Sequence, residues 1–179
     1  MSIETKLPTP DIEEFDKAFD AGIALKRLDE TISSIKDEQD KKGMASLRDN
    51  FIESISSYSA SIAAFEMTSK ARINITDSKD RKCFQSEMED SDARRRRNHQ
   101  LLITNFNVLV RNFSQRNIDL SWTSVISNNL YERIKKSDEK SLAHIVDFDK
   151  NHEDREKIGE WAINCGKYLK IQEQIKKAA

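Results

Sequence analysis

Apolar residues recur along most of the chain at intervals of three or four positions, which is the spacing of one face of an α-helix. The pattern is clearest in residues 45–73, where serines and charged side chains occupy the positions between the apolar ones. This segment therefore predicts an amphipathic helix with one face in a core. Its apolar face consists of Leu47, Phe51, Ile55, Tyr58, Ile62 and Phe65.

A similar pattern predicts a helix before this one and several after it. Asp11 precedes the first apolar position and is the expected N-cap of the first helix, and Asp154 is that of the last helix. The polar run 37–43 is expected to separate the first two helices, with Gly43 as the end signal. The core face of the first helix is assigned to Ile12, Phe15, Phe19, Ile23, Leu28, Ile32 and Ile35. The remaining helices are expected at residues 79–115, 122–134, 142–148 and 154–175, and the acidic stretch 87–92 is either continuous helix or a local break.

Composition supports an all-α fold. The chain of 179 residues holds only 4 Gly and 2 Pro, and it shows neither sustained two-residue alternation nor an Asn-Gly or Asp-Gly hairpin turn. Hydrophobic residues make up 37% and charged residues 34%, a balance typical of amphipathic helices. Residues 1–10, which contain Pro8 and Pro10, are expected to form a flexible leader. Residues 11–179 are expected to form a single bundle of five or six mostly antiparallel helices.

Several classes of protein are disfavoured by what the sequence lacks. No apolar run approaches the roughly 20 residues that span a bilayer, and no secretory signal is visible, so we expect a soluble, cytoplasmic protein with no membrane contact. Cys83 and Cys165 are too far apart in sequence to suggest a metal-ligand pair or a disulfide framework. Neither a glycine-rich phosphate loop nor a G-x-S-x-G motif occurs, which disfavours a P-loop nucleotidase and a serine hydrolase. No cofactor is expected.

Positive charge is concentrated in one part of a nearly neutral chain. The net charge is −1, but residues 81–116 hold eight Lys or Arg and only four Asp or Glu. Within them, the stretch DARRRRNHQLL at residues 92–102 places four consecutive arginines before a histidine and an apolar run. A charge run of this kind is usually a solvated face. Whether it also predicts a binding site depends on how its side chains are arranged around the helix.

Helical geometry divides these four arginines into two pairs. Side chains three or four positions apart are neighbours on a helix. Asp92 is therefore expected to face Arg95 and Arg96, and both arginines are expected to face His99, while the other two arginines point elsewhere. A carboxylate, two guanidinium groups and an imidazole would then form one stripe along the helix.

The stripe has two interpretations, both of which the sequence leaves open. Guanidinium forks match the oxygens of a phosphate, and histidine exchanges a proton near neutral pH, so the stripe predicts a site for a nucleotide or RNA. His99 and Arg95 are then the candidate catalytic residues, and Arg155 of the last helix would complete the site from across the bundle. The structural interpretation is an ion-paired helix surface. The candidate ligand-binding residues are Asp92, Arg95, Arg96, His99 and Arg155.

Two motifs follow one another along the chain. The first, D-x-x-R-R-x-x-H with the L-I and N-x-L-x-R elements, is read at Asp92, Arg95, Arg96, His99, Leu102, Ile103, Asn107, Leu109 and Arg111. The second, D-R-x-x-[IV]-G-x-[FW]-A, is read at Asp154, Arg155, Ile158, Gly159, Trp161 and Ala162. In this order the two motifs resemble an uncharacterised family of bacterial and phage proteins, a domain of unknown function. The resemblance covers roughly residues 50–170, and it implies a helical fold and no established activity.

A looser resemblance connects the arginine run with HEPN-type ribonucleases, which are helical bundles with an R-x(4–6)-H motif completed by dimerisation. Arg94 and His99 have the shortest of these spacings. The family often has a polar residue such as Asn directly after the arginine, and this chain departs from that pattern with Arg95. The resemblance implies metal-independent cleavage of RNA by a homodimer. A third hypothesis is a phage-encoded inhibitor that binds a host defence protein and uses the stripe as a structural lock or docking surface.

Three further features receive structural interpretations. Gly159 on a helix, two residues before Trp161, indicates close approach of two helices, and both Trp122 and Trp161 fall on core faces. A cluster of metal-ligating residue types matches no known ligand spacing, so it is interpreted as a polar helix end and no metal is expected. The cluster consists of His144, Asp147, Asp149, His152, Glu153 and Asp154.

Overall fold

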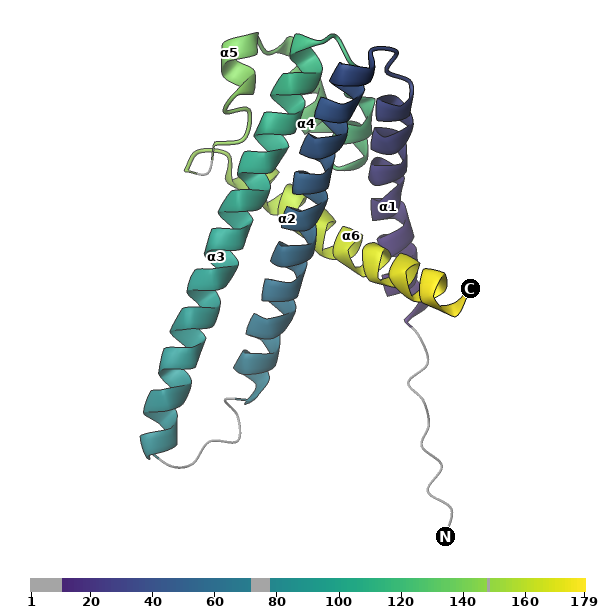
Figure 1. Cartoon of the computed structure of the whole chain (residues 1–179). Coiled ribbons are helices and arrows are strands. Elements are labelled where there is room, and N and C mark those ends of the chain that lie inside the picture. Colours follow the sequence, from purple (N-terminus) through teal and green to yellow (C-terminus); the bar gives the residue numbers. More distant parts are fainter. Residues whose placement is uncertain (1–10, 72–77, 148) are drawn as a thin grey trace.

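A computed structural model describes residues 11–71, 78–147 and 149–179, and in these residues the chain is an all-α bundle without strands (Figure 1). The all-α prediction is confirmed. The expected leader lies outside the described residues. The elements are α1 (Ile12–Ser33), α2 (Glu38–Ala71), α3 (Ser78–Gln115), a 3-10 helix η2 (Ser121–Val125), α4 (Asn128–Lys136), α5 (Glu139–Leu142) and α6 (His152–Ala178).

The arrangement combines an antiparallel helix pair with an oblique crossing. Helices α2 and α3 pack side by side in opposite directions, and the end of α2 and the start of α3 extend beyond α6 (Figure 1). Helix α6 packs on both α1 and α2 and runs obliquely across them, so it departs from the mostly antiparallel bundle expected from the sequence (Figure 1). This crossing brings the last helix against the middle of α3, where the charged stripe lies.

The core is centred on Trp122, which the 3-10 helix carries into the bundle. Its indole ring lies 6.1 Å from the ring of Phe51, 5.9 Å from Phe106 and 6.4 Å from Phe113, measured between centroids. Trp161 of α6 also stacks on Phe51, with 5.8 Å between the ring centroids. The prediction that both tryptophans belong to the core is therefore confirmed.

Two glycines of α6 allow the oblique crossing. A Cβ atom on Gly166 would overlap the side chain of Ser59 on α2. A Cβ atom on Gly159 would lie 3.1 Å from the Tyr58 hydroxyl oxygen and 3.3 Å from His99 Nε2. The close approach expected at Gly159 is confirmed, and it places α6 directly against the histidine of the stripe.

The predicted break at residues 37–43 is wrong, because α2 already begins at Glu38. Asp37 caps the helix there: its carboxylate accepts a hydrogen bond from the Asp40 amide at 2.8 Å, and its carbonyl accepts one from the Lys41 amide at 2.9 Å. Gly43 is therefore an exposed helical residue, and a Cβ atom added to it would have no other group within 4 Å. A good cap several residues earlier outweighs the small helix-forming penalty of one glycine.

The predicted N-cap of the last helix is also wrong. Helix α6 begins at His152, after Asn151, and Asp154 instead forms an ion pair with Arg133 of α4. The Asp154 carboxylate therefore binds a side chain that is distant in sequence, although local sequence rules assign it to an N-cap.

The chain between residues 121 and 148 is less helical than its apolar spacing predicts. The single helix expected at 122–134 is divided at Ser127, whose hydroxyl caps α4 by accepting from the Leu130 amide at 3.3 Å. The helix expected at 142–148 is wrong, because α5 ends at Leu142. Asn107 of α3 holds the following backbone: its amide donates to the Val146 carbonyl at 2.9 Å, and its oxygen accepts from the Val146 amide at 3.2 Å.

The core face assigned to the first helix is wrong in its N-terminal half. Leu28 and Ile32 are buried as expected, but Ile12 and Phe15 are 75% and 46% exposed. The N-terminal half of α1 packs on α6 through a different face made of small residues. The buried residues of α1 are Ala18, Ala21, Gly22, Ala24, Leu25, Leu28 and Ile32.

Candidate functional site

Four of the five predicted site residues line one open hollow of about 440 Å³ between α3, α6 and α2. The expectation that Arg155 approaches the stripe from the last helix agrees with this placement. Sequence reasoning missed the remaining lining residues, since no local pattern connects them with the arginine run. The hollow is lined by Tyr58, Arg95, Arg96, His99, Arg155, Glu156, Glu160 and Ile163.

Asp92, the fifth predicted residue, fixes the two arginines of α3. One carboxylate oxygen lies 2.6 Å from Nη2 of Arg95, and the other lies 2.7 Å from Nη2 of Arg96. The hydrogen bond from Arg95, followed by the positive charges of both arginines, lowers the pKa of Asp92 from its ordinary value. The expected pairing of Asp92 with Arg95 and Arg96 is therefore confirmed, and Asp92 holds both arginines without itself lining the hollow.

The two anchored arginines differ in exposure. The Arg95 side chain is 32% exposed and its guanidinium carbon lies 5.1 Å from the centre of the Phe65 ring, while the Arg96 side chain is 72% exposed. A guanidinium held by a carboxylate and an aromatic ring loses little further freedom when it binds a ligand. Arg95 is therefore the more preorganised of the two donors.

His99 lies at the junction of α2, α3 and α6. Its ring stacks on Tyr58 with 4.8 Å between centroids, and its Nε2 lies 3.1 Å from the Arg155 carbonyl oxygen. A carbonyl oxygen only accepts, so Nε2 carries the proton and donates it to this bond. Burial, followed by the charges of Arg155 and Arg95, lowers the pKa of His99 from its ordinary value of 6.5, although the carbonyl acceptor opposes the shift. His99 is therefore neutral at neutral pH and positions α6 against α3.

The lowered pKa of His99 predicts a pH-dependent loss of stability. As the pH falls through 6.5 towards the folded-state value, the unfolded chain takes up the proton first, so the free energy of unfolding decreases. In urea unfolding at about pH 7.5 and about pH 5.5, the decrease should be smaller for His99→Gln than for the unchanged protein.

A matched control for this experiment is His144→Gln, because His144 is exposed and lies outside the hollow. The carboxylates contribute equally to the pH dependence of the free energy of unfolding in all three proteins. A difference between the proteins therefore reports the contribution of His99. An identical pH dependence in His99→Gln and the unchanged protein would contradict the assignment of a proton-linked role to His99.

The spacing that resembles HEPN-type ribonucleases does not bring Arg94 and His99 together in one chain. Residues five positions apart lie about 140° apart around a helix. Arg94 is exposed, whereas His99 faces α2 and α6. A composite site built by two chains stays a prediction of the sequence.

The acidic and histidine-rich segment before α6 makes structural contacts. The Asp147 carboxylate accepts a hydrogen bond from the Asp149 amide at 2.9 Å, and His152 Nδ1 accepts one from the Arg155 guanidinium at 2.6 Å. Over residues 11–71, 78–147 and 149–179, no group of three His, Cys, Asp or Glu side chains is placed to hold a metal ion. The polar helix-end interpretation accounts for these contacts.

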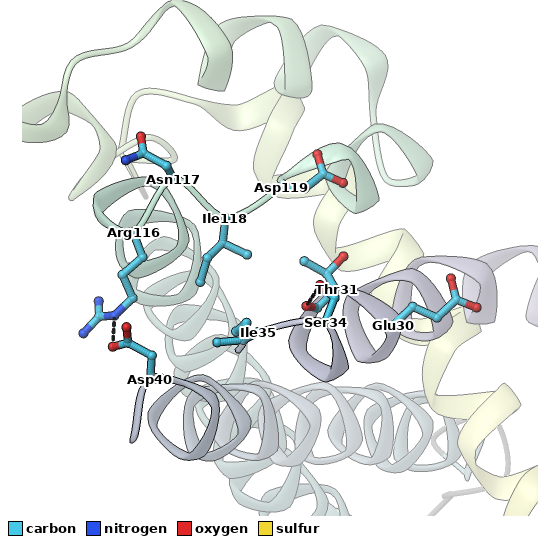
Figure 2. Close-up of a pocket in the computed structure, with 9 residues that line it drawn as sticks. All are labelled: Glu30, Thr31, Ser34, Ile35, Asp40, Arg116, Asn117, Ile118 and Asp119. Carbon is cyan, nitrogen blue, oxygen red and sulfur yellow. Dashed lines mark hydrogen bonds and ion pairs between the residues drawn. The ribbon is translucent and has the colours of Figure 1, made fainter. Parts of the chain in front are cut away.

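A second hollow of about 520 Å³ lies where the α1–α2 turn meets the end of α3 (Figure 2). Ile35 and Ile118 lie in its middle, and Arg116 donates to the Asp40 carboxylate at 2.9 Å on one side (Figure 2). On the other side, the Asp119 carboxylate accepts from the Ser121 amide at 3.1 Å, which fixes the start of the 3-10 helix. These polar groups join chain segments, and none of the predicted site residues lies here.

A third hollow of about 540 Å³ adjoins the first one and shares Glu160 and Ile163 with it. The rest of its lining comes from α1, from the residue before α1 and from two further residues of α6. This third hollow contains more acidic than basic groups. Its lysines are already paired with glutamates of α1. The lining is Asp11, Glu13, Glu14, Lys17, Glu160, Ile163, Asn164 and Lys167.

Comparison of the chain with protein-family models, curated protein sequences and solved structures finds no match in any of the three. The structure thus defines the class of the molecule, an all-α bundle with an arginine-lined hollow, without assigning it to a family. Both resemblances noted in the sequence stay predictions. In the described part of the chain, no helix has an apolar stretch long enough to cross a bilayer.

Proposed function

We propose that the protein binds a small phosphate-bearing ligand of the nucleotide class in the hollow between α3 and α6. The observation that carries this proposal is that three arginines from two helices, Arg95, Arg96 and Arg155, line one hollow. Its volume of about 440 Å³ falls within the range of small-molecule sites. A cytoplasmic location is the matching expectation from the sequence.

The chemistry of the lining suits a phosphate at one end of the ligand. Arginine forks donate paired hydrogen bonds to phosphate oxygens, and the ion pairs with Asp92 leave further N–H groups of Arg95 and Arg96 as donors. Glu156 and Glu160 supply acceptors for hydroxyl or amino groups elsewhere on the ligand. The site therefore offers both kinds of group that a nucleotide requires.

The surroundings favour a compact nucleotide over a strand of RNA. A strand that continues along α6 would bring further phosphates beside Glu160, Glu14 and Asp11 of the adjoining hollow. Like charges at that separation disfavour binding. We therefore infer a ligand with a single phosphate group or a short phosphate chain.

In this proposal His99 is a positioning residue. His99 Nε2 donates a hydrogen bond to the Arg155 carbonyl oxygen, and the side chain of Arg155 is one of the proposed phosphate-binding groups. The imidazole therefore fixes the distance between the α3 arginines and Arg155. The proposal assigns binding to this hollow and assigns no catalytic step.

Binding of nucleoside mono-, di- and triphosphates and of inorganic phosphate, measured by isothermal titration calorimetry, tests this function. Arg155→Ala retains the backbone carbonyl that His99 needs, so its effect reports the side chain. Loss of a hydrogen bond to a charged group costs about 1.5–3 kcal/mol, so Arg95→Ala and Arg155→Ala should each weaken binding roughly 10- to 150-fold.

The matched control is Arg94→Ala, which removes the same charge from the same helix at an exposed position that does not line the hollow. It should leave affinity within about twofold, since an exposed distant charge contributes little at physiological salt. No binding by the unchanged protein, or equal losses in Arg94→Ala and Arg95→Ala, would overturn the proposed function.

A further inference from the structure

Helix α1 carries a second apolar face that the bundle leaves uncovered. Phe15, Phe19 and Ile23 follow one another at intervals of four residues, and Ile12 precedes them by three, so they form one ridge. Phe19 is half-buried, while the other three side chains are exposed. At 100° per residue, this ridge points about 145° away from the buried face of the same helix.

The uncovered surface extends onto α6. The Phe19 ring contacts the Tyr168 ring edge-on at 5.6 Å, and Phe15 lies 4.7 Å from Phe19 between centroids. Ile171 and Ile175 follow Tyr168 by three and seven residues on the same side of α6, and Ile175 is exposed. The α1 ridge surface is defined here as the exposed side chains of Ile12, Phe15, Ile23 and Ile175 together with the half-buried Phe19 and Ile171. Exposed apolar side chains grouped in this way are typical of an interaction site.

The charge along the ridge changes from net negative to net positive. Asp16 and Asp20 flank its N-terminal half, and Lys26, Arg27 and Glu30 follow its C-terminal end. None of these five side chains forms an ion pair with another residue in the described part of the chain. These side chains therefore give a net negative charge at one end of the ridge and a net positive charge at the other.

This order makes the surface complementary to itself. Two copies related by a twofold axis, with their α1 helices antiparallel, place the acidic half of each ridge opposite the basic end of the other. A parallel pairing would oppose like charges and is disfavoured. Apolar side chains four residues apart also form a ridge of the kind that packs into the groove between two side-chain ridges of a second helix.

We propose that a second copy of this chain covers the α1 ridge surface and that the protein is an antiparallel, twofold-symmetric dimer through α1. Lipid and nucleic-acid surfaces fit less well, because the N-cap and the first half of α1 are strongly acidic. The acidic residues there are Asp11, Glu13, Glu14, Asp16 and Asp20. The proposal is independent of the nucleotide-binding function.

Sedimentation velocity over a range from low micromolar to several hundred micromolar tests the dimer. The unchanged protein should sediment as a dimer at the upper end, while Phe15→Glu should remain a monomer, because it removes an exposed aromatic ring of the ridge and buries a carboxylate in an apolar interface. Phe15 is exposed within the single chain, so the variant should keep its helical circular dichroism and its unfolding midpoint.

Met67→Glu is the matched control, since Met67 is 73% exposed on α2 and lies outside the α1 ridge surface. This variant should dimerise like the unchanged protein. A monomeric unchanged protein at all concentrations, or a dimer that Phe15→Glu does not dissociate, would overturn the proposal.

A charge exchange tests the antiparallel arrangement. Lys26→Glu combined with Arg27→Glu should weaken dimerisation, and adding Asp16→Lys with Asp20→Lys should restore it, because the complementarity is then rebuilt with reversed signs. Failure of the second pair to restore dimerisation would contradict the antiparallel arrangement. Arg155→Ala should leave the dimer unchanged, so a failure here is distinguishable from a failure of nucleotide binding.

Discussion

Trp122→Ala should lower the free energy of unfolding by about 3–5 kcal/mol, the usual cost of removing a buried aromatic side chain. Trp122 is fully buried and touches three phenylalanine rings, contributed by α2 and α3. Its removal leaves a cavity at the place where the 3-10 helix joins these two helices. Urea unfolding followed by far-ultraviolet circular dichroism measures the change.

Two phenylalanine variants provide the control for this prediction. The Trp161 indole donates to the Ala21 carbonyl at 3.1 Å, whereas the Trp122 indole nitrogen is buried with no hydrogen-bond partner among the described residues. Trp161→Phe removes a satisfied hydrogen bond and Trp122→Phe removes an unsatisfied donor, so the first should cost about 1 kcal/mol more. The opposite order, or a loss below about 1 kcal/mol in Trp122→Ala, would contradict close packing of the Trp122 indole against the three phenylalanine rings.

Gly166→Ala should destabilise the fold by about 1–3 kcal/mol, because the added methyl group overlaps the Ser59 side chain and α6 must move away from α2. The same movement would separate Arg155 and Gly159 from His99, since all three lie at this crossing. The variant should therefore also weaken binding at the hollow. Equilibrium unfolding and nucleotide titration of the same protein measure both effects.

Gly43→Ala is the matched control, because it makes the same chemical change at an exposed helical position where the methyl group meets no other atom. It should stabilise the protein by about 0.5–1 kcal/mol, the difference in helix propensity between the two residues. Equal effects of the two substitutions would show that α6 does not depend on close packing at Gly166.

The charged stripe illustrates which parts of a site can be predicted from a sequence. The pairing of Asp92 with Arg95 and Arg96 is local, so helical spacing alone predicts it. The partner of His99 is a backbone carbonyl 56 residues later, and no side-chain pattern records that contact. Tyr58 shows the same limit, since its spacing places it on a core face and only the packing of α2 against α3 stacks it on the imidazole.

Errors in the predicted helices have a common physical origin. Asp154 has the local properties of an N-cap, but an ion pair with Arg133 fixes it elsewhere. The residues after Leu142 have helical apolar spacing, but the Asn107 side chain bonds their backbone in a non-helical arrangement. In each case a contact between distant segments supplies more stabilisation than the local preference, which is worth about 1 kcal/mol.

The sequence by itself determined the all-α fold, most helix positions and the local order of the arginine stripe, because these depend on periodicity and on neighbours within one turn. Only the tertiary structure decided which face of α1 is buried and where Arg155 meets His99. Small residues such as Gly22 and Gly166 let α6 approach closely, and that approach is favoured over burial of the larger Phe15 and Ile23. Close packing between two helices depends on how well their surfaces fit together. The fit depends on both helices and on how they cross, so the residue pattern of one helix alone does not predict it.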